Sequence, residues 1–121
     1  MKIAIKRVYE KASDDDGQRI LVDRLWPRGL SKAEAHLDGW LKEAAPTSEL
    51  RKWFGHEPEK WSGFREKYRH ELTHRPETKE ALAELHKLSR HGKLTLLYGA
   101  HDEEHNQAIV LKEALLGKKT T

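Results

Sequence analysis

The sequence contains no cysteine among its 121 residues. This absence excludes disulfide bonds, thiolate nucleophiles and cysteine-ligated zinc sites. No apolar run approaches the roughly 20 residues that a membrane-spanning helix requires. The first residues also lack the hydrophobic stretch of a signal peptide. We therefore expect a protein without a membrane segment, located in the cytoplasm.

A large excess of one charge is also missing, since 23 Lys and Arg stand against 20 Asp and Glu, which gives a net charge of +3. A dedicated nucleic-acid-binding domain usually has a more one-sided balance. Four Trp, three Tyr and two Phe nevertheless supply large apolar side chains. The length predicts one domain over residues 1–116, followed by a frayed tail at residues 117–121.

Short apolar runs bounded by turn residues predict the strands. The connection between the first two runs is too short for a helical crossover, so we expect those two strands to pair antiparallel. The predicted strands cover residues 3–8, 19–23 and 93–98, with a further short strand within 37–43.

Capping residues and apolar spacing predict about five helices. Ser31 and Glu34 have the spacing of a capping box, and Thr47 is a suitable N-cap for the next helix. Pro76 ends one helix and opens another, and Asp102 loads negative charge onto the start of the last. The interleaved elements predict an α/β layered sandwich with a small mixed sheet of three to four strands.

Ligands of such folds bind beyond the C-terminal ends of the strands. Two loops that lead from a strand to a helix therefore mark the candidate site, one at residues 23–30 and one at residues 98–105. If their strands are parallel, both loops lie at the same edge of the sheet.

The first loop reads Asp23-Arg24-Leu25-Trp26-Pro27-Arg28-Gly29. Arg24 and Arg28 have the guanidinium groups that grip carboxylates and phosphates. Asp23 stands at the strand end, where a carboxylate can orient an arginine or act as a general base. A structural corner, with Trp26 packed and Asp23 paired to an arginine, explains the same residues equally well.

The second loop contains Tyr98, Asp102, His105 and Asn106. Tyr98 and His105 are suited to acid–base or hydrogen-bonding work. The alternative is purely structural, with Asp102 as an N-cap and His105 as a surface residue in the first helical turn.

His70-Glu71-Leu72-Thr73-His74 matches the H-E-x-x-H pattern, in which two histidines on one helical face bind zinc beside a glutamate base. Pro76 ends the helix soon after the motif, so surface residues at a helix end are the better interpretation. The sequence specifies no third ligand, although three residues are available to try: His86, Glu80 and Glu84.

Three segments together, in their order and spacing, resemble the YeaO-like family, a domain of unknown function. The resemblance covers nearly the whole chain and implies that both candidate loops are family hallmarks. The segments are Arg7-Val8-Tyr9 leading to Val22–Gly29, then Ser48–Phe54, then Leu96-Leu97-Tyr98 leading to Glu104-His105-Asn106 and Ala108.

The resemblance also concerns cysteine chemistry. Longer relatives carry a Cys at the end of the last strand and a Cys-His-Arg sequence in the following helix. The matching positions here are Tyr98 and His105-Asn106-Gln107. The resemblance therefore implies that any reaction depending on those cysteines is absent from this chain.

The sequence thus favours a domain that binds an anionic small molecule, nucleotide-like or phosphate-like. Arg24 and Arg28, helped by Lys42 or Arg51, would neutralise the anion, and the aromatic ring of Trp26 or Tyr98 would pack on it. The ligand-binding candidates are Asp23, Arg24, Trp26, Arg28, Gly29, Tyr98, Asp102, His105 and Asn106.

Three other functions stay open. Asp23, Tyr98 and His105 are the catalytic candidates if the domain is an enzyme. A nucleic-acid-binding module would use the same arginines with Trp26 and Trp53. A zinc hydrolase built on residues 70–74 is the least favoured, and the sequence specifies neither a metal nor a cofactor.

Overall fold

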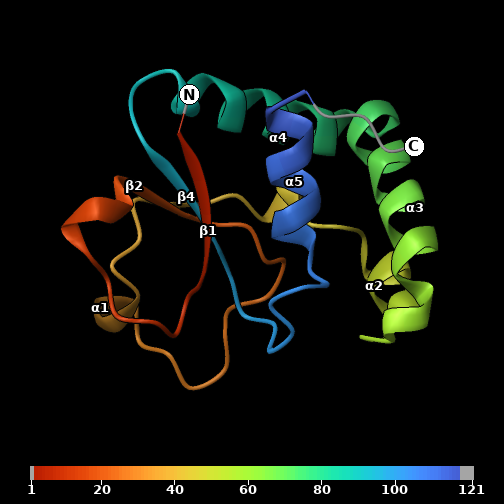
Figure 1. Cartoon of the computed structure of the whole chain (residues 1–121), viewed down its shortest axis with the longest axis horizontal. Coiled ribbons are helices and arrows are strands. Elements are labelled where there is room, and N and C mark those ends of the chain that lie inside the picture. The colour runs from red at the N-terminus through yellow and green to blue at the C-terminus, as the bar shows by residue number, and fades with distance from the viewer. Residues whose placement is uncertain (1, 118–121) are drawn as a thin grey trace.

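A computed structural model describes residues 2–117 and forms a four-stranded sheet in the order β1-β4-β2-β3. Every strand pair in it is parallel. The central strand β4 has all five residues buried, as the run of apolar side chains predicts. The strands are β1 (Ile3–Arg7), β2 (Gln18–Leu21), β3 (Gly39–Trp40) and β4 (Leu94–Tyr98) (Figure 1).

Five α-helices and three short 3-10 helices complete residues 2–117. The predicted α/β class, the number of strands and the number of helices are confirmed, and so are the caps at Ser31 and Thr47. The frayed tail predicted at residues 117–121 lies, apart from Gly117, outside the described residues. The helices are α1 (Lys32–Ala35), α2 (Ser48–Phe54), α3 (Trp61–His74), α4 (Pro76–Ser89) and α5 (Gln107–Leu115), with η1 (Asp14–Asp16), η2 (Lys42–Ala44) and η3 (Pro58–Lys60).

The predicted antiparallel pairing of the first two strands is wrong, and so is the mixed character of the sheet. β4 lies between β1 and β2 and pairs in parallel with both. The chain returns from β1 to β2 through residues 8–17, which contain only the short helix η1. An extended segment advances roughly 3.3 Å per residue, so this connection is long enough without the usual crossover helix.

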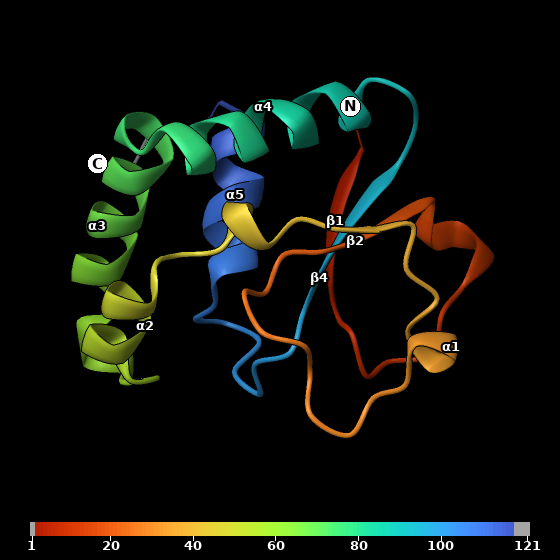
Figure 2. The ribbon, with the colours of Figure 1, turned by 180° about the vertical axis from the view of Figure 1, so that it is seen from behind.

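The two faces of the sheet are covered differently. Helices α2 to α5 supply the main core on one face, where they pack on alternate residues of the strands, such as Ile20, Leu96 and Tyr98. The other face carries a smaller core, with Ala35 of α1 and the indole rings of Trp26 and Trp40. Figure 2 shows α1 among the connecting loops, separate from the group of larger helices.

The second face also buries an ion pair. Arg19 is 4% exposed, and its Nη1 lies 2.5 Å from Asp16 Oδ2. The other guanidinium nitrogens donate to the carbonyl oxygens of His36 and Ala35 at 3.0 and 2.8 Å. Lys6 Nζ lies 3.1 Å from the same aspartate, so η1 and α1 are both fastened to the sheet.

Candidate functional site

The two candidate loops meet at one edge of the sheet. β2 and β4 are parallel neighbours, so the loops that follow them start side by side. The ribbon views place the turns of both loops at the end of the molecule opposite α4 (Figures 1 and 2). Contact between the loops is close, because a Cβ added to Gly99 would lie 3.8 Å from the Cβ of Pro27. The expectation of a shared edge is therefore confirmed.

Asp23 joins three elements at this edge. Its Oδ2 accepts a hydrogen bond from the Gly99 backbone N–H at 2.8 Å, and its Oδ1 accepts one from Gln107 Nε2 at the start of α5. The Trp40 indole N–H donates to the Asp23 carbonyl at 2.6 Å. A Cβ on Gly99 would lie only 2.9 Å from Oδ2, so the close approach depends on glycine. We call Asp23, Gly99 and Gln107 the Asp23 junction.

Burial raises the pKa of Asp23 to about 6, although hydrogen bonds from Gly99 and Gln107 and the positive charge of Arg51 act in the opposite direction. Removal from water disfavours the charged form of a carboxyl group. A strongly shifted pKa of a carboxyl group is a typical feature of functional sites.

Two residues of the first loop serve the fold. Arg24 donates from Nε to Pro46 O and from Nη2 to Ala45 O, both at 3.1 Å, which holds the segment before α2. Trp26 donates to Leu30 O at 2.6 Å and packs edge-on against Trp40, with ring centres 5.3 Å apart. The structural-corner interpretation therefore describes the contacts of Arg24 and Trp26.

Two other arginines project into solvent. The side chains of Arg28 and Arg51 are exposed and have no hydrogen bond or ion pair to any residue in the range 2–117. The Arg28 carbonyl accepts a hydrogen bond from the Tyr9 hydroxyl at 2.8 Å, and Gly29 adopts a φ of 75° that favours glycine. The first loop is thus fixed by its backbone while the Arg28 guanidinium stays available.

The remaining candidates, Lys42 and Trp53, each take part in contacts between an ammonium group and an aromatic ring. Lys42 Nζ lies 4.4 Å from the centre of the Trp40 ring. Trp53 is 39% exposed, and the ammonium groups of Lys60 and Lys67 lie 5.4 and 4.9 Å from its ring centre. These pairs are cation–π contacts within the protein.

The second loop is organised around Asp102. Its Oδ1 accepts hydrogen bonds from the backbone N–H groups of Glu104 and His105, at 2.9 and 3.0 Å, and these lower its pKa. The predicted start of the last helix at Asp102 is wrong. The N-cap is Asn106, whose Oδ1 accepts a hydrogen bond from Ile109 N at 3.2 Å. Asp102 instead closes the turn that immediately precedes the helix.

Tyr98 and His105 are both packed against neighbours. Tyr98 is only 2% exposed, and burial raises the pKa of its hydroxyl, although a hydrogen bond with the Asn106 side chain acts in the opposite direction. His105 Nδ1 lies 2.9 Å from Asp102 Oδ2, and its ring packs edge-on against Trp61 at 5.3 Å between centres. Of the two, only the partly exposed His105 imidazole has a surface to offer a ligand.

Sequence reasoning missed two residues of this edge, Arg7 and Gln107. Arg7 ends β1, and its Nε donates to Ala100 O at 2.8 Å while its guanidinium lies over the Tyr9 ring. The signal was present, because Arg7 belongs to a family motif, but the antiparallel prediction placed it at the opposite edge. Gln107 was noted only as a position that matches the relatives' Cys-His-Arg sequence, and nothing local pointed to its partner Asp23, which lies 84 residues earlier.

The H-E-x-x-H motif is part of the helix packing. Glu71 accepts hydrogen bonds from Thr47 N and Thr47 Oγ1, at 3.0 and 2.6 Å, so its carboxylate holds the start of α2. The exposed rings of His70 and His74 stack on each other, with centres 4.0 Å apart. Within residues 2–117 no group of three or more His, Cys, Asp or Glu is placed to hold a metal ion.

Replacing Glu71 with alanine is expected to lower the free energy of unfolding by about 1–3 kcal/mol, because the partly buried Thr47 N–H then loses its partner. His70→Ala is the matched control and should change stability by less than about 0.5 kcal/mol, as an exposed substitution does. Urea unfolding measures both. Equal stability losses in the two variants, or zinc-dependent stabilisation lost in His70→Ala, would contradict this assignment.

No helix in the described part of the chain is long and apolar enough to cross a bilayer.

The chain is 46% identical to the uncharacterised protein YeaO of Escherichia coli (strain K12), over 95% of this chain and 97% of that protein. It is 38% identical to an uncharacterised protein of Mycobacterium tuberculosis (strain H37Rv), over 97% of this chain and 96% of that protein. No solved structure matches it significantly.

The family comparison covers the whole domain. The sequence model described as "Inactive DUF488-N3 subclade" matches residues 2–121. This match and the similarity to YeaO agree with the motifs in both candidate loops. The chain is therefore a YeaO-like protein that belongs to the inactive DUF488-N3 subclade.

Proposed function

We propose that this domain is a non-catalytic binding module for a phosphorylated, hydroxyl-bearing small molecule such as a nucleotide. The observation that carries the proposal is the Asp23 junction. It holds a carboxyl group, with its pKa raised to about 6, at the edge where parallel α/β sheets bind ligands. Arg28 lies in the same loop, and the charge of Arg51 acts on Asp23.

A carboxylate and two free guanidinium groups suit the two halves of such a ligand. A carboxylate oxygen accepts more than one hydrogen bond, so the donors of the protein leave Asp23 with capacity for a sugar hydroxyl. The guanidinium groups of Arg28 and Arg51 would neutralise the phosphate with paired hydrogen bonds. Both arginines are exposed and form no ion pair within residues 2–117.

Binding is favoured over catalysis by two observations. The family is described as an inactive subclade. Of the catalytic candidates, Tyr98 is buried in the core. A general base also remains available in Asp23, whose pKa of about 6 fits that role, so turnover of the bound ligand is the decisive alternative outcome.

A thermal-shift screen tests the proposal. Nucleoside phosphates and sugar phosphates should raise the melting temperature, and the matching unphosphorylated nucleosides should not. A ligand at 100 times its Kd adds about 2.7 kcal/mol to the stability of the folded state. Arg28→Met and Arg51→Met should each weaken binding by about tenfold or more, the loss expected for a charge-assisted contact. Lys52→Met, at an exposed neighbouring position on α2, should bind like the wild type.

Three outcomes would count against the proposed function. One is a screen in which no phosphorylated compound raises the melting temperature. Another is calorimetric affinity unchanged in both arginine variants. Conversion of the ligand during incubation would show that the domain is an enzyme.

A further inference from the structure

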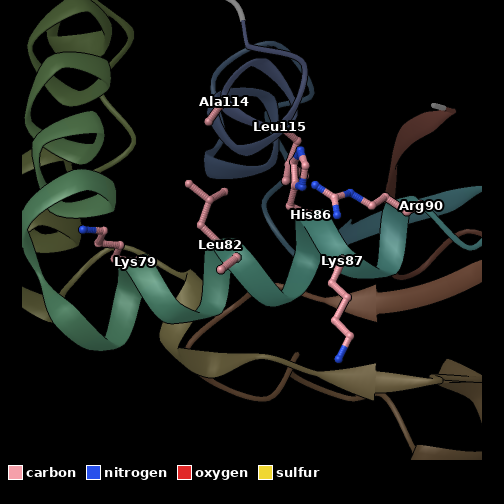
Figure 3. A pocket seen from close by; sticks show the side chains of 8 residues that line it. Lys79, Leu82, His86, Lys87, Arg90, Ala114 and Leu115 are labelled. Carbon is pink, nitrogen blue, oxygen red and sulfur yellow. The ribbon is translucent and has the colours of Figure 1, made fainter.

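A groove of about 620 Å³ lies between α4 and the last turn of α5. It is remote from the Asp23 junction, because α4 leads into the start of β4 whereas the junction lies beyond the end of that strand (Figure 1). We call it the α4–α5 groove, and its lining residues are Lys79, Leu82, Ala83, His86, Lys87, Arg90, Ala114 and Leu115 (Figure 3).

The lining combines an apolar middle with cationic ends. Figure 3 shows Leu82 pointing across the groove towards Ala114, with Lys79 at one end and His86 and Arg90 near the other. No acidic residue lines the groove, although the chain as a whole has almost as many acidic as basic residues. Among residues 2–117, the side chains of Lys79 and Arg90 form no ion pair.

The two ends are separated by a length that suits a helix. Lys79 and Arg90 lie eleven residues apart along α4 and its C-cap, which corresponds to roughly 16 Å at a rise of about 1.5 Å per residue. A second helix laid along α4 would place acidic side chains three turns apart at the same distance. Apolar residues at intervals of three or four positions would then meet the apolar middle of the groove.

We propose that the α4–α5 groove docks an acidic amphipathic helix of a partner protein. Charge complementarity selects this occupant, because an anionic partner satisfies both cationic ends while its apolar face covers the partly exposed Leu82 and Ala114. The chain's own C-terminal residues do not have the required charge, since Lys118 and Lys119 follow Gly117. The groove is open along α4, which suits a peptide surface better than an enclosed small molecule.

The test uses a fluorescein-labelled helical peptide of about 18 residues, with two glutamates about eleven positions apart and leucines between them. Fluorescence anisotropy should show saturable binding to the full chain, weakened as salt rises. The same peptide with lysines in place of the glutamates should not bind. Arg90→Glu should weaken binding by about tenfold or more, because it removes one favourable charge contact. Ala83→Glu should weaken binding by a similar factor, because it places a carboxylate in the groove that repels the acidic peptide.

Ala83 is exposed on α4 and glutamate is a good helix former, so Ala83→Glu should keep the wild-type melting temperature. Lys52→Glu, on the exposed side of α2, is the control for a change in net charge and should bind the acidic peptide nearly as well as the wild type. Failure of the acidic peptide to bind, or equal binding by Ala83→Glu, would overturn the proposal.

Two competing occupants are tested in the same samples. Sedimentation of the peptide-free protein should give a monomer. A dimer that Ala83→Glu dissociates would assign the groove to a second copy of the chain and overturn the proposal. Displacement of the acidic peptide by a single-stranded oligonucleotide, with loss of oligonucleotide binding in Arg90→Glu, would overturn it in favour of nucleic acid.

Discussion

Asp23→Asn is expected to stabilise the domain at neutral pH, by up to about 3 kcal/mol. The pKa of Asp23 rises from 3.8 to about 6 on folding, and each pKa unit corresponds to about 1.4 kcal/mol. The asparagine has no charge to remove from water. Its oxygen still accepts the Gly99 N–H, and its amide group donates to Gln107 once the Gln107 side-chain amide turns over.

The pH dependence gives the sign of this effect. Because the folded state holds the Asp23 proton more tightly, its contribution is full below pH 3.8 and is lost as the pH rises through about 6. The stability of the wild type should therefore fall relative to that of Asp23→Asn between these pH values. At pH 4 the advantage of the variant should be nearly gone.

Urea unfolding at a series of pH values measures the difference. Asp23→Ala is the matched control, because it removes the charge together with both hydrogen bonds and should not show the full gain. A constant difference between wild type and Asp23→Asn from pH 4 to pH 8 would contradict the prediction. If the more stable variant also loses the phosphorylated ligand, the carboxylate is kept for binding at the expense of stability.

The second large effect is expected at the buried ion pair of Arg19 and Asp16, on the face of the sheet that carries the smaller core. Arg19→Met should lower the free energy of unfolding by about 3–5 kcal/mol, because it leaves the buried Asp16 carboxylate without its main partner. The carbonyl oxygens of Ala35 and His36 lose their donors at the same time. Chemical unfolding at neutral pH measures the loss.

Lys60→Met is the control for this prediction. Lys60 forms an ion pair with Glu57 at 3.1 Å, but these side chains are 35% and 48% exposed, so the expected loss is below about 1 kcal/mol. Similar losses in the two variants would show that burial does not determine how much the Arg19–Asp16 pair contributes to the free energy of unfolding. Combining Arg19→Met with Asp16→Ala should recover part of the loss, since no buried charge is then left unpaired.

Local patterns predicted the elements of the fold but not their arrangement. The caps at Ser31 and Thr47 satisfy backbone groups within three residues, so the sequence displays them directly. The pairing of β1 with β4 joins residues some 90 positions apart, and no local pattern encodes it. The error came from a general rule about crossover length, which the helix-free segment 8–17 does not follow.

In the candidate site, too, the sequence predicted single residues but not their partners. Asp23 was predictable from its place at the end of a buried strand, whereas its partners Gly99 and Gln107 were fixed only by the strand order. Arg24 and Trp26 had the chemistry of ligand-binding residues, and their structural use depends on the distant carbonyl of Pro46 and the ring of Trp40. Asp102 and Asn106 are both suitable caps, and only the course of the backbone distinguishes their roles.

The position of β4 has a consequence for the order of synthesis. This strand lies between β1 and β2, so the two N-terminal strands have no neighbour in common until residues 94–98 have left the ribosome. At about 5–20 residues per second, the strands made first wait several seconds for the strand that joins them. β2 has its other neighbour, β3, within that interval, whereas β1 joins the sheet only when β4 is inserted between them.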